Sequence, residues 1–252
     1  MNIASVALLV AAGFLGGLAN ALAGGASLFT FPALLASGLS PITANASNAF
    51  ALLPANSMAA WADAEKIPPR NAITLIILAC SMVGGILGAV LLLETSARFF
   101  QLMVPALIGL ATVMFLFGKG LRQFLVRLLG AGEHPKLCAS LVFLSGIYGG
   151  YFGAGLGVVL MAVLGATTVW DMRMANAYKN ILNVGANAMA NVLFVTMGMI
   201  AWHETLIMIL GTTVGGYVGG KLVRVLPAHM VRIAICWSGV VMTAIYVYRY
   251  WL

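Results

Sequence analysis

The chain has 252 residues, of which 62% are hydrophobic and only 8% are charged, and its mean hydropathy is +1.05. Soluble domains carry about 25% charged residues, so this composition excludes a soluble protein and predicts an all-α polytopic membrane protein. The net charge of +7 is accounted for by basic loops and needs no nucleic acid partner, and the three isolated cysteines predict neither a disulfide nor a metal site.

Ten apolar segments follow one another along the chain. The fourth and fifth reach the roughly 20 residues that a membrane-spanning helix needs, whereas the first two and the sixth and seventh are short or interrupted by glycine. No Lys or Arg precedes the first segment, so we expect it to be a permanent part of the protein and not a cleaved signal peptide. The segments are 3–22, 26–39, 43–61, 71–93, 98–118, 137–151, 154–170, 175–199, 204–220 and 231–251.

The second part of the sequence repeats the first. An offset of 131 residues superimposes three motifs of small residues, and an offset of 133 superimposes a set of glycines. This self-similarity predicts an internal duplication with halves at residues 1–125 and 126–252, which together form one membrane domain. The matches are Ala44-Asn45-Ala46 with Ala175-Asn176-Ala177, Ala55-Asn56 with Ala186-Asn187, Gly84-Gly85-x-x-Gly88 with Gly215-Gly216-x-x-Gly219, and Gly13, Gly16 and Gly17 with Gly146, Gly149 and Gly150.

The charges of the loops predict how the chain is oriented. If the first two segments return the chain to the side where it began, and the sixth and seventh do the same, then only Arg98 and Arg249 lie on one side and the other eleven Lys and Arg residues lie on the opposite side. Cytoplasmic loops carry the excess of Lys and Arg, so we expect both termini outside the cytoplasm. The halves would then be inverted-topology repeats, each with a glycine-rich broken or re-entrant helix pair and three spanning helices.

Two glycine-rich stretches, Leu18 to Pro32 and Gly149 to Leu160, separate the short segments of each half. We expect a re-entrant hairpin to turn at each stretch, because glycine permits a tight turn and leaves backbone N–H groups accessible. A half-helix that begins at such a turn directs the positive end of its dipole to the membrane centre, where an anion would suit it. The alternative is that these glycines only allow close helix packing, as we expect at Gly84 and Gly88.

The stretch AGGASLFTFPALLASGLSPITANASNAF, from Ala23 to Phe50, resembles the signature of the TauE/SafE family of sulfite exporters and anion permeases. A glycine-rich turn, a Pro-x-Leu and an alanine-rich helix start follow in the family's order, although Ala26 stands where a third glycine is usual and Leu156 interrupts the second glycine run. In length, duplication and hydropathy the likeness covers the full chain. The resemblance implies a multi-pass protein of the bacterial cytoplasmic (inner) membrane that moves sulfite, sulfonates or other small organic anions.

The eighth segment carries a stripe of asparagines at spacings of 4, 3, 4 and 4, which keeps them on one helical face. In the first half, Asn45, Asn48 and Asn56 occupy matching places. An amide both donates and accepts hydrogen bonds without carrying a charge, so the stripe favours a permeation path, and the alternative is hydrogen bonding between helices. The stripe consists of Asn176, Asn180, Asn183, Asn187 and Asn191.

Lys179 lies about seven residues inside the same segment, or on the order of 10 Å from its cytoplasmic end. Its ammonium could meet an anionic substrate there, or it could extend back to the lipid headgroups. Its counterpart Asn48 carries no charge, so the two halves are unequal at this position. We interpret Asp63 and Glu65, like the other acidic residues, as solvated loop residues.

These observations predict a secondary transporter, an exporter of a small organic or sulfur-containing anion such as sulfite or a sulfonate, that works by alternating access between the repeats. The alternatives are a passive anion channel and, less favoured because the sequence holds no catalytic cluster, an intramembrane enzyme or assembly factor. We expect no enzymatic activity, cofactor or metal; the partners considered are a small anion, the lipid bilayer, a coupling ion (proton or sodium) and a second copy in a homodimer. The predicted substrate-binding residues are Asn20, Gly24, Gly25, Ser27, Asn45, Asn48, Asn176, Lys179, Asn180, Asn183 and Asn187.

Overall fold

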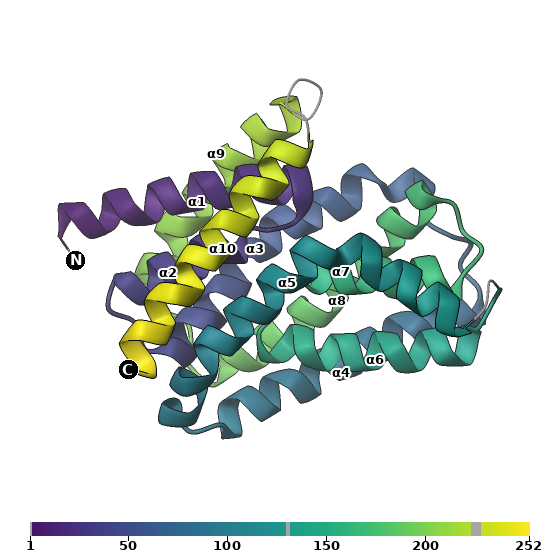
Figure 1. The fold of residues 1–252 in the computed structure, drawn as a ribbon, viewed down its shortest axis with the longest axis horizontal. Helices are drawn as coiled ribbons and strands as arrows, with labels where there is room; N and C mark the ends of the chain where they lie inside the picture. The colour runs from purple at the N-terminus through teal and green to yellow at the C-terminus, as the bar shows by residue number, and fades with distance from the viewer. Residues whose placement is uncertain (1, 130–131, 223–227) are drawn as a thin grey trace.

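The computed structural model describes residues 2–129, 132–222 and 228–252, and within these residues it contains helices and no strand (Figure 1). The prediction of an all-α protein is therefore confirmed. The α-helices are α1 (Ile3–Ala23), α2 (Ser27–Ala36), α3 (Pro41–Ala62), α4 (Ala72–Glu94), α5 (Ala97–Leu129), α6 (Pro135–Tyr151), α7 (Leu156–Thr167), α8 (Met172–Thr196), α9 (Trp202–Leu222) and α10 (Ala228–Tyr250), and a short 3-10 helix, η1 (Ala64–Lys66), follows α3.

Large apolar side chains cover the outer surface of the helices. Ile76 and Leu91 on α4, and Trp237 and Val241 on α10, are all exposed. A soluble protein would not leave such continuous apolar surfaces in water, because they would associate. Together with the apolar composition, these surfaces identify a polytopic membrane protein. Four described helical stretches are long and apolar enough to cross a bilayer: Ile3–Ala21, Ala72–Glu94, Ala97–Gly118 and Arg232–Tyr250.

The ten predicted segments correspond one to one with the ten α-helices, and the largest difference lies in α5. This helix continues to Leu129, whereas the predicted segment ends at Gly118. The continuation KGLRQFLVRLL alternates basic and apolar residues at helical spacing, so it forms an amphipathic helix that a search for purely apolar runs does not detect. Helix α2, in contrast, is shorter than its predicted segment, 26–39. It ends at Ala36, shortly before Gly38, which has a positive φ of 99°.

Helices α3, α4 and α8, which contribute to the site or support it, begin at side-chain caps. Ser40 precedes α3, Asn71 precedes α4 and Asp171 precedes α8, and each side chain accepts a hydrogen bond from a backbone N–H of the first turn. Such caps satisfy donors that would otherwise lack partners and fix the residue at which the helix starts. The polar faces of α3 and α8 therefore begin at defined positions.

Close glycine contacts join helices that are distant in the sequence. Helix α1 packs along α9, and α6 packs along α4. A Cβ atom at Gly215 would collide with the carbonyl oxygen of Phe14, and one at Gly88 would collide with that of Ile147. Backbones in membranes approach closely where residues are small, so these contacts explain the matched Gly-Gly-x-x-Gly motifs of α4 and α9.

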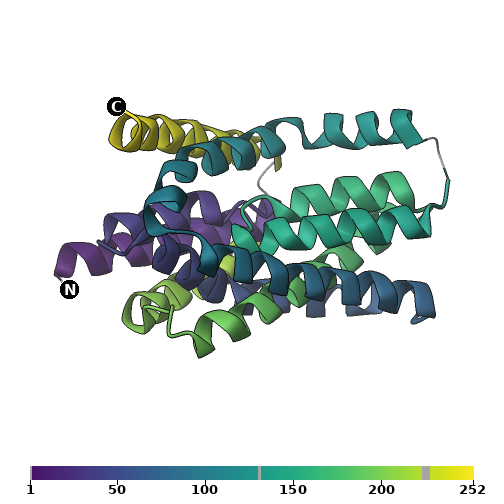
Figure 2. The ribbon, with the colours of Figure 1, turned by 90° about the horizontal axis from the view of Figure 1, so that it is seen from below.

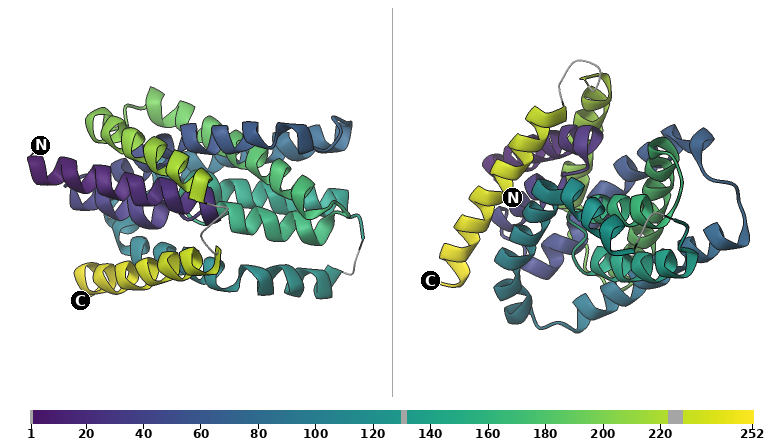
Figure 3. Two further views of the ribbon diagram at one scale, coloured as in Figure 1. Left: turned by 90° about the horizontal axis from the view of Figure 1, so that it is seen from above. Right: turned by 45° about the vertical axis from the view of Figure 1, so that its right-hand side comes forward.

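The molecule is elongated, and both termini lie at the same end of its long axis (Figure 2). The connection between α3 and α4 and the end of α5 lie at the opposite end. Helices α6 and α7 run side by side and stop near the middle of the long axis, where the chain turns between them (Figures 2 and 3). The α1–α2 turn faces this point, because the two turns line a common cavity.

Candidate functional site

A small polar cavity of about 30 Å³ lies between the α1–α2 turn and the α6–α7 turn. Its wall is completed by α3 and α8, and none of its described lining residues carries a charge. Six of the predicted site residues, from helices α1, α2, α3 and α8 and from the α1–α2 turn, meet here. They are Asn20, Gly24, Ser27, Asn48, Asn183 and Asn187.

Glycines in the left-handed region of the backbone make both turns. Gly24 (φ 78°) ends α1, and Gly153 (φ 77°) and Gly155 (φ 82°) precede α7. Other residues adopt these angles only with strain. Because α2 begins at Ser27 and α7 at Leu156, the N-terminal ends of both helices lie at the cavity, and their backbone N–H groups and dipoles give it a positive potential without a buried charge.

Amide hydrogen bonds connect the α1–α2 turn to α3. Nδ2 of Asn20 donates to Oδ1 of Asn56 at 3.0 Å, and Nδ2 of Asn48 donates to Oγ of Ser27 at 3.2 Å. All four residues line the cavity. Their remaining donors and acceptors are uncharged, so they can replace the water shell of a polar ligand inside the cavity.

On α8, two asparagines of the predicted stripe act as a unit. Nδ2 of Asn187 donates to the backbone oxygen of Asn183 at 2.8 Å and to its Oδ1 at 2.7 Å. Asn187 is buried, and a Cβ atom built on Gly153 would lie 3.8 Å from its Oδ1. The α6–α7 turn therefore approaches the amide face of α8, as the α1–α2 turn approaches the amides of α3.

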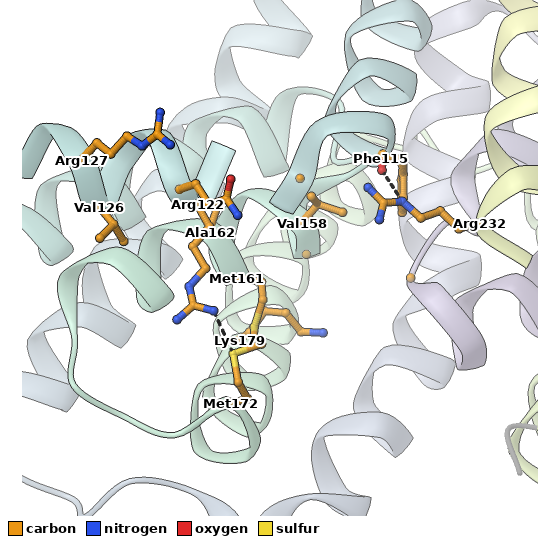
Figure 4. Close-up of a pocket in the computed structure, with 14 residues that line it drawn as sticks. Phe115, Arg122, Val126, Arg127, Val158, Met161, Ala162, Met172, Lys179 and Arg232 are labelled. Carbon is orange, nitrogen blue, oxygen red and sulfur yellow. Dashed lines mark hydrogen bonds between the residues drawn. The ribbon is translucent and has the colours of Figure 1, made fainter. Parts of the chain in front are cut away.

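A larger cavity of about 790 Å³ adjoins the small one, because Gly24 and Gly157 line both. It lies between α5, α7, α8 and α10 (Figure 4). None of its described lining residues is an Asp or Glu, and four of the described ones are cationic: Lys179, Arg122, Arg127 and Arg232.

Uncharged acceptors hold two of these arginines in place. Nε of Arg232 donates to the backbone oxygen of Phe115 at 2.7 Å, and Nε of Arg122 donates to that of Gly165 at 3.2 Å. In Figure 4, Arg232 lies at one end of the group and Arg127 at the other. Because carbonyl groups orient the guanidinium groups without neutralising them, the cavity keeps a positive potential that attracts anions.

Asp63, at the C-terminal end of α3, connects this helix to α8. Its Oδ2 accepts hydrogen bonds from Nδ2 of Asn176 at 3.0 Å and of Asn180 at 3.3 Å. Nζ of Lys179 donates to Oδ1 of Asn176 at 3.0 Å, so Asn176 lies between the carboxylate and the ammonium. Asn176 and Asn180 line neither cavity. The side chain of Asp63 is only 25% exposed and organises the polar face of α8, which its interpretation as a solvated loop residue did not anticipate.

Two further predicted residues also lie outside both cavities. Asn45 is buried on α3, and its Nδ2 donates to the backbone oxygen of Tyr151 at 3.0 Å, at the end of α6. Gly25 is buried beside the side chain of Ile235 on α10. Both positions hold the hairpins against neighbouring helices.

The sequence analysis missed polar residues that line the cavities, among them Arg122, Arg127, Arg232 and Asn56. Arg122 and Arg127 were counted only as loop charges, because the fifth segment was ended at Gly118. Arg232 was counted only as a charge at the start of the tenth segment. The basic, amphipathic pattern after that glycine is the signal that would have placed Arg122 on a helix. Asn56 was recognised as the counterpart of Asn187 but was left out of the site, and that match was the signal for including it.

Comparisons with known proteins assign the chain to a group of transporters. The model of the family described as Sulfite exporter TauE/SafE matches residues 9–246. A "Probable membrane transporter protein" of Haemophilus influenzae is 26% identical over 249 residues, which cover 96% of this chain and 94% of the relative. The "Probable membrane transporter protein YfcA" of Escherichia coli K12 is 25% identical over 236 residues, 91% of this chain and 85% of the relative. No solved structure matches significantly.

Proposed function

The chain belongs to the TauE/SafE sulfite exporter family and is a membrane transporter, and we propose that it exports a small organic or sulfur-containing anion such as sulfite or a sulfonate. The observation that supports this best is the junction of the two cavities at Gly24 and Gly157. Cations in the larger cavity would concentrate an anion. The amides and helix N-termini of the small cavity would then replace the water around its acidic group.

The contacts between helices support our further proposal that residues 1–125 and 126–252 are inverted repeats. A two-fold axis in the membrane plane that related α1 to α6 would also relate α9 to α4. The α1–α9 and α6–α4 contacts would then be equivalent by symmetry. Helix α3 packs on α8, and α5 packs on α10, as pairs that lie on such an axis would. The α1–α2 and α6–α7 pairs would then be re-entrant hairpins that meet near the bilayer midplane.

The wide cavity beside α7 supports alternating access. Asn48 and Thr30 lie in the part of the first half that corresponds to the cavity wall around Lys179. Both are buried, and Oγ1 of Thr30 donates a hydrogen bond to Oδ1 of Asn48 at 2.5 Å. One repeat is thus closed around its hairpin while the other is open. We propose that this conformation is open to the cytoplasm, because the wide cavity extends to Val126 and Arg127 near the basic end of α5, and that the repeats exchange these arrangements during transport.

Counterflow in proteoliposomes tests the proposed function. Vesicles that contain the purified protein and are preloaded with unlabelled methanesulfonate should take up labelled sulfite or sulfonate faster than the same vesicles without internal anion. The reason is that a carrier exchanges substrates across the membrane. A Lys179→Ala variant should lower uptake at low substrate concentration by about tenfold or more, as expected from the loss of a hydrogen bond to a charged group.

The matched control is Arg173→Ala, which removes an exposed cation from the first turn of the same helix and lies outside both cavities. It should leave uptake unchanged. Uptake that preloading does not stimulate would identify a passive channel. Full activity of Lys179→Ala, or no uptake of any anion, would contradict the proposal.

A further inference from the structure

We propose that Asp63 is the counter-charge of Lys179 when no substrate is bound, and that its carboxylate allows the empty carrier to reorient between the two sides of the membrane. This inference rests on the proposed function, because it assigns a residue to the return step of the same carrier. The hydrogen bonds around Asp63, the apolar surroundings of Lys179 and the comparison of the two halves support it.

One amide connects the carboxylate of Asp63 to the ammonium of Lys179. Oδ2 of Asp63 accepts hydrogen bonds from Nδ2 of Asn176 at 3.0 Å and of Asn180 at 3.3 Å. Nζ of Lys179 donates to Oδ1 of Asn176 at 3.0 Å. Because Asn176 and Asn180 flank Lys179 on α8, a change of side-chain rotamer can bring the two charges together. The second oxygen, Oδ1, lies 3.8 Å from Nζ of Lys66, but this lysine is half exposed and such surface pairs contribute little.

Closure of the larger cavity would leave the ammonium of Lys179 without an acceptor on α7. Lys179 is half-buried here, and a Cβ atom built on Gly157 would lie 3.8 Å from its Cδ, so its stem runs beside the start of α7. Val158 and Met161 line the same part of the cavity and offer no strong acceptor (Figure 4). A charge that is buried without a partner is costly, so the cavity can close only if Lys179 is neutralised. A bound anion would neutralise it, and Asp63 can do so in the empty carrier.

The matching part of the first half lacks both the base and the acid. At the offset of 131 residues, Asn48 corresponds to Lys179 and Phe194 to Asp63. Asn48 is buried and forms hydrogen bonds with two hydroxyl groups of α2, so this half is closed around an uncharged amide that needs no counter-charge. The carboxylate is therefore found in the half that carries the ammonium, as expected if its purpose is to neutralise it.

A counter-charge affects the two modes of transport differently. Exchange of one substrate molecule for another uses only loaded forms of the carrier, in which the anion neutralises Lys179. Net efflux also requires the empty form to reorient, and in that form Asp63 must neutralise Lys179. Loss of the carboxylate charge should therefore slow net efflux and spare exchange.

Two flux measurements on the same proteoliposomes test the inference. Vesicles that contain the full-length protein and saturating radiolabelled methanesulfonate would be diluted into buffer without this anion to measure net efflux, or into buffer with unlabelled methanesulfonate to measure exchange. Potassium on both sides and valinomycin would prevent a membrane potential from limiting efflux. For Asp63→Asn we expect net efflux to fall by about tenfold or more, because a buried charge loses its partner, and exchange to stay within about twofold of the wild type.

The controls separate the charge of Asp63 from a structural role. Asp63→Glu keeps the charge and should retain most of the net efflux. Glu65→Gln removes an exposed acid two residues away and should change neither flux. The amide oxygen introduced by Asp63→Asn can still accept hydrogen bonds from Asn176 and Asn180, so a purely structural role predicts that this variant keeps its net efflux.

Each outcome has a distinct meaning. Unchanged net efflux in Asp63→Asn, or an equal loss of efflux and exchange, would overturn the inference and leave the transport of anions intact. A wild type that exchanges methanesulfonate without net efflux would also overturn it, because the empty carrier would then not reorient. Absence of both fluxes in the wild type would instead contradict the proposed function itself.

Discussion

Lys179 and Asn48 occupy matching positions, but their surroundings differ. Asn48 exchanges hydrogen bonds with Ser27 and Thr30, so its amide is satisfied within its own half. Lys179 faces a hydrocarbon wall on α7 and instead donates to Asn176, one turn earlier on its own helix. Asn176 is neutral, and the described lining of the cavity contains no Asp or Glu, so the position of this ammonium favours the anion-binding role over extension to the lipid headgroups.

The carboxylate of Asp63 opposes this role electrostatically, because Asn176 alone separates it from Lys179. We predict that Asp63→Asn increases the affinity for the anion severalfold, on the order of 1 kcal/mol, since a negative charge near the cation is removed. Binding measured at low and high salt checks this, and the gain should shrink with salt. Glu65→Gln, which removes an exposed acid two residues away, is the control and should change little. An unchanged or weaker affinity for Asp63→Asn would contradict the electrostatic reasoning.

The asparagine spacing predicted which side chains share a face of α8, because that follows from helical geometry alone. It could not predict what lies opposite each of them. Asn176 meets Asp63, 113 residues earlier in the chain, whereas Asn187 lies beside the α6–α7 turn. One stripe therefore contributes to two environments, a cavity lining and a contact between helices, and the permeation path itself stays a prediction.

At the scale of helices, the sequence predicted the positions of the helices better than it predicted which helices pack together. Hydropathy located all ten helices, because a membrane requires apolar surface over the length of each span. The spacing of Gly84, Gly85 and Gly88 predicted close packing but not the partner, since any helix with small residues would fit. The partner is α6, where a Cβ atom at Gly84 would collide with the carbonyl oxygen of Phe143.

A Gly88→Ala substitution tests this packing. The new Cβ atom would overlap the carbonyl oxygen of Ile147, and backbone cannot move aside as a flexible side chain does, so α4 and α6 must separate. We predict a loss of stability of about 1–3 kcal/mol, as for overpacked cores. Thermal unfolding in detergent would measure it. Gly120→Ala, on the exposed part of α5, meets no atom within 4 Å and should not destabilise the protein. Equal melting temperatures for the two variants would show that the α4–α6 contact is looser than described.

For the whole molecule, the distribution of Lys and Arg and the internal repeat predicted that both termini lie on the same side of the membrane, outside the cytoplasm, and the side on which they lie stays a prediction. Both termini lie at one end, and the α3–α4 connection and the end of α5 lie at the other (Figure 2). The wide cavity could not be predicted, because an internal repeat in the sequence predicts two similar halves but not a cavity beside one of them. Arg232 of α10 and Arg122 of α5 reach it only through the packing of these helices around α7.

The orientation can be tested with two exposed residues that α5 separates, Arg98 at its start and Lys136 just after its end. Cysteines at these positions would be introduced singly after Cys80, Cys138 and Cys236 are replaced by alanine. Because cytoplasmic loops carry most Lys and Arg, we predict that a membrane-impermeant maleimide labels position 98 in intact bacterial cells. Position 136 should react only after the membrane is permeabilised. Retained transport by each variant would show that the fold is preserved. Labelling of position 136 from outside would reverse the assignment of the wide cavity to the cytoplasmic side, and labelling of both positions from one side would contradict the crossing of α5 and, with it, the inverted arrangement of the halves.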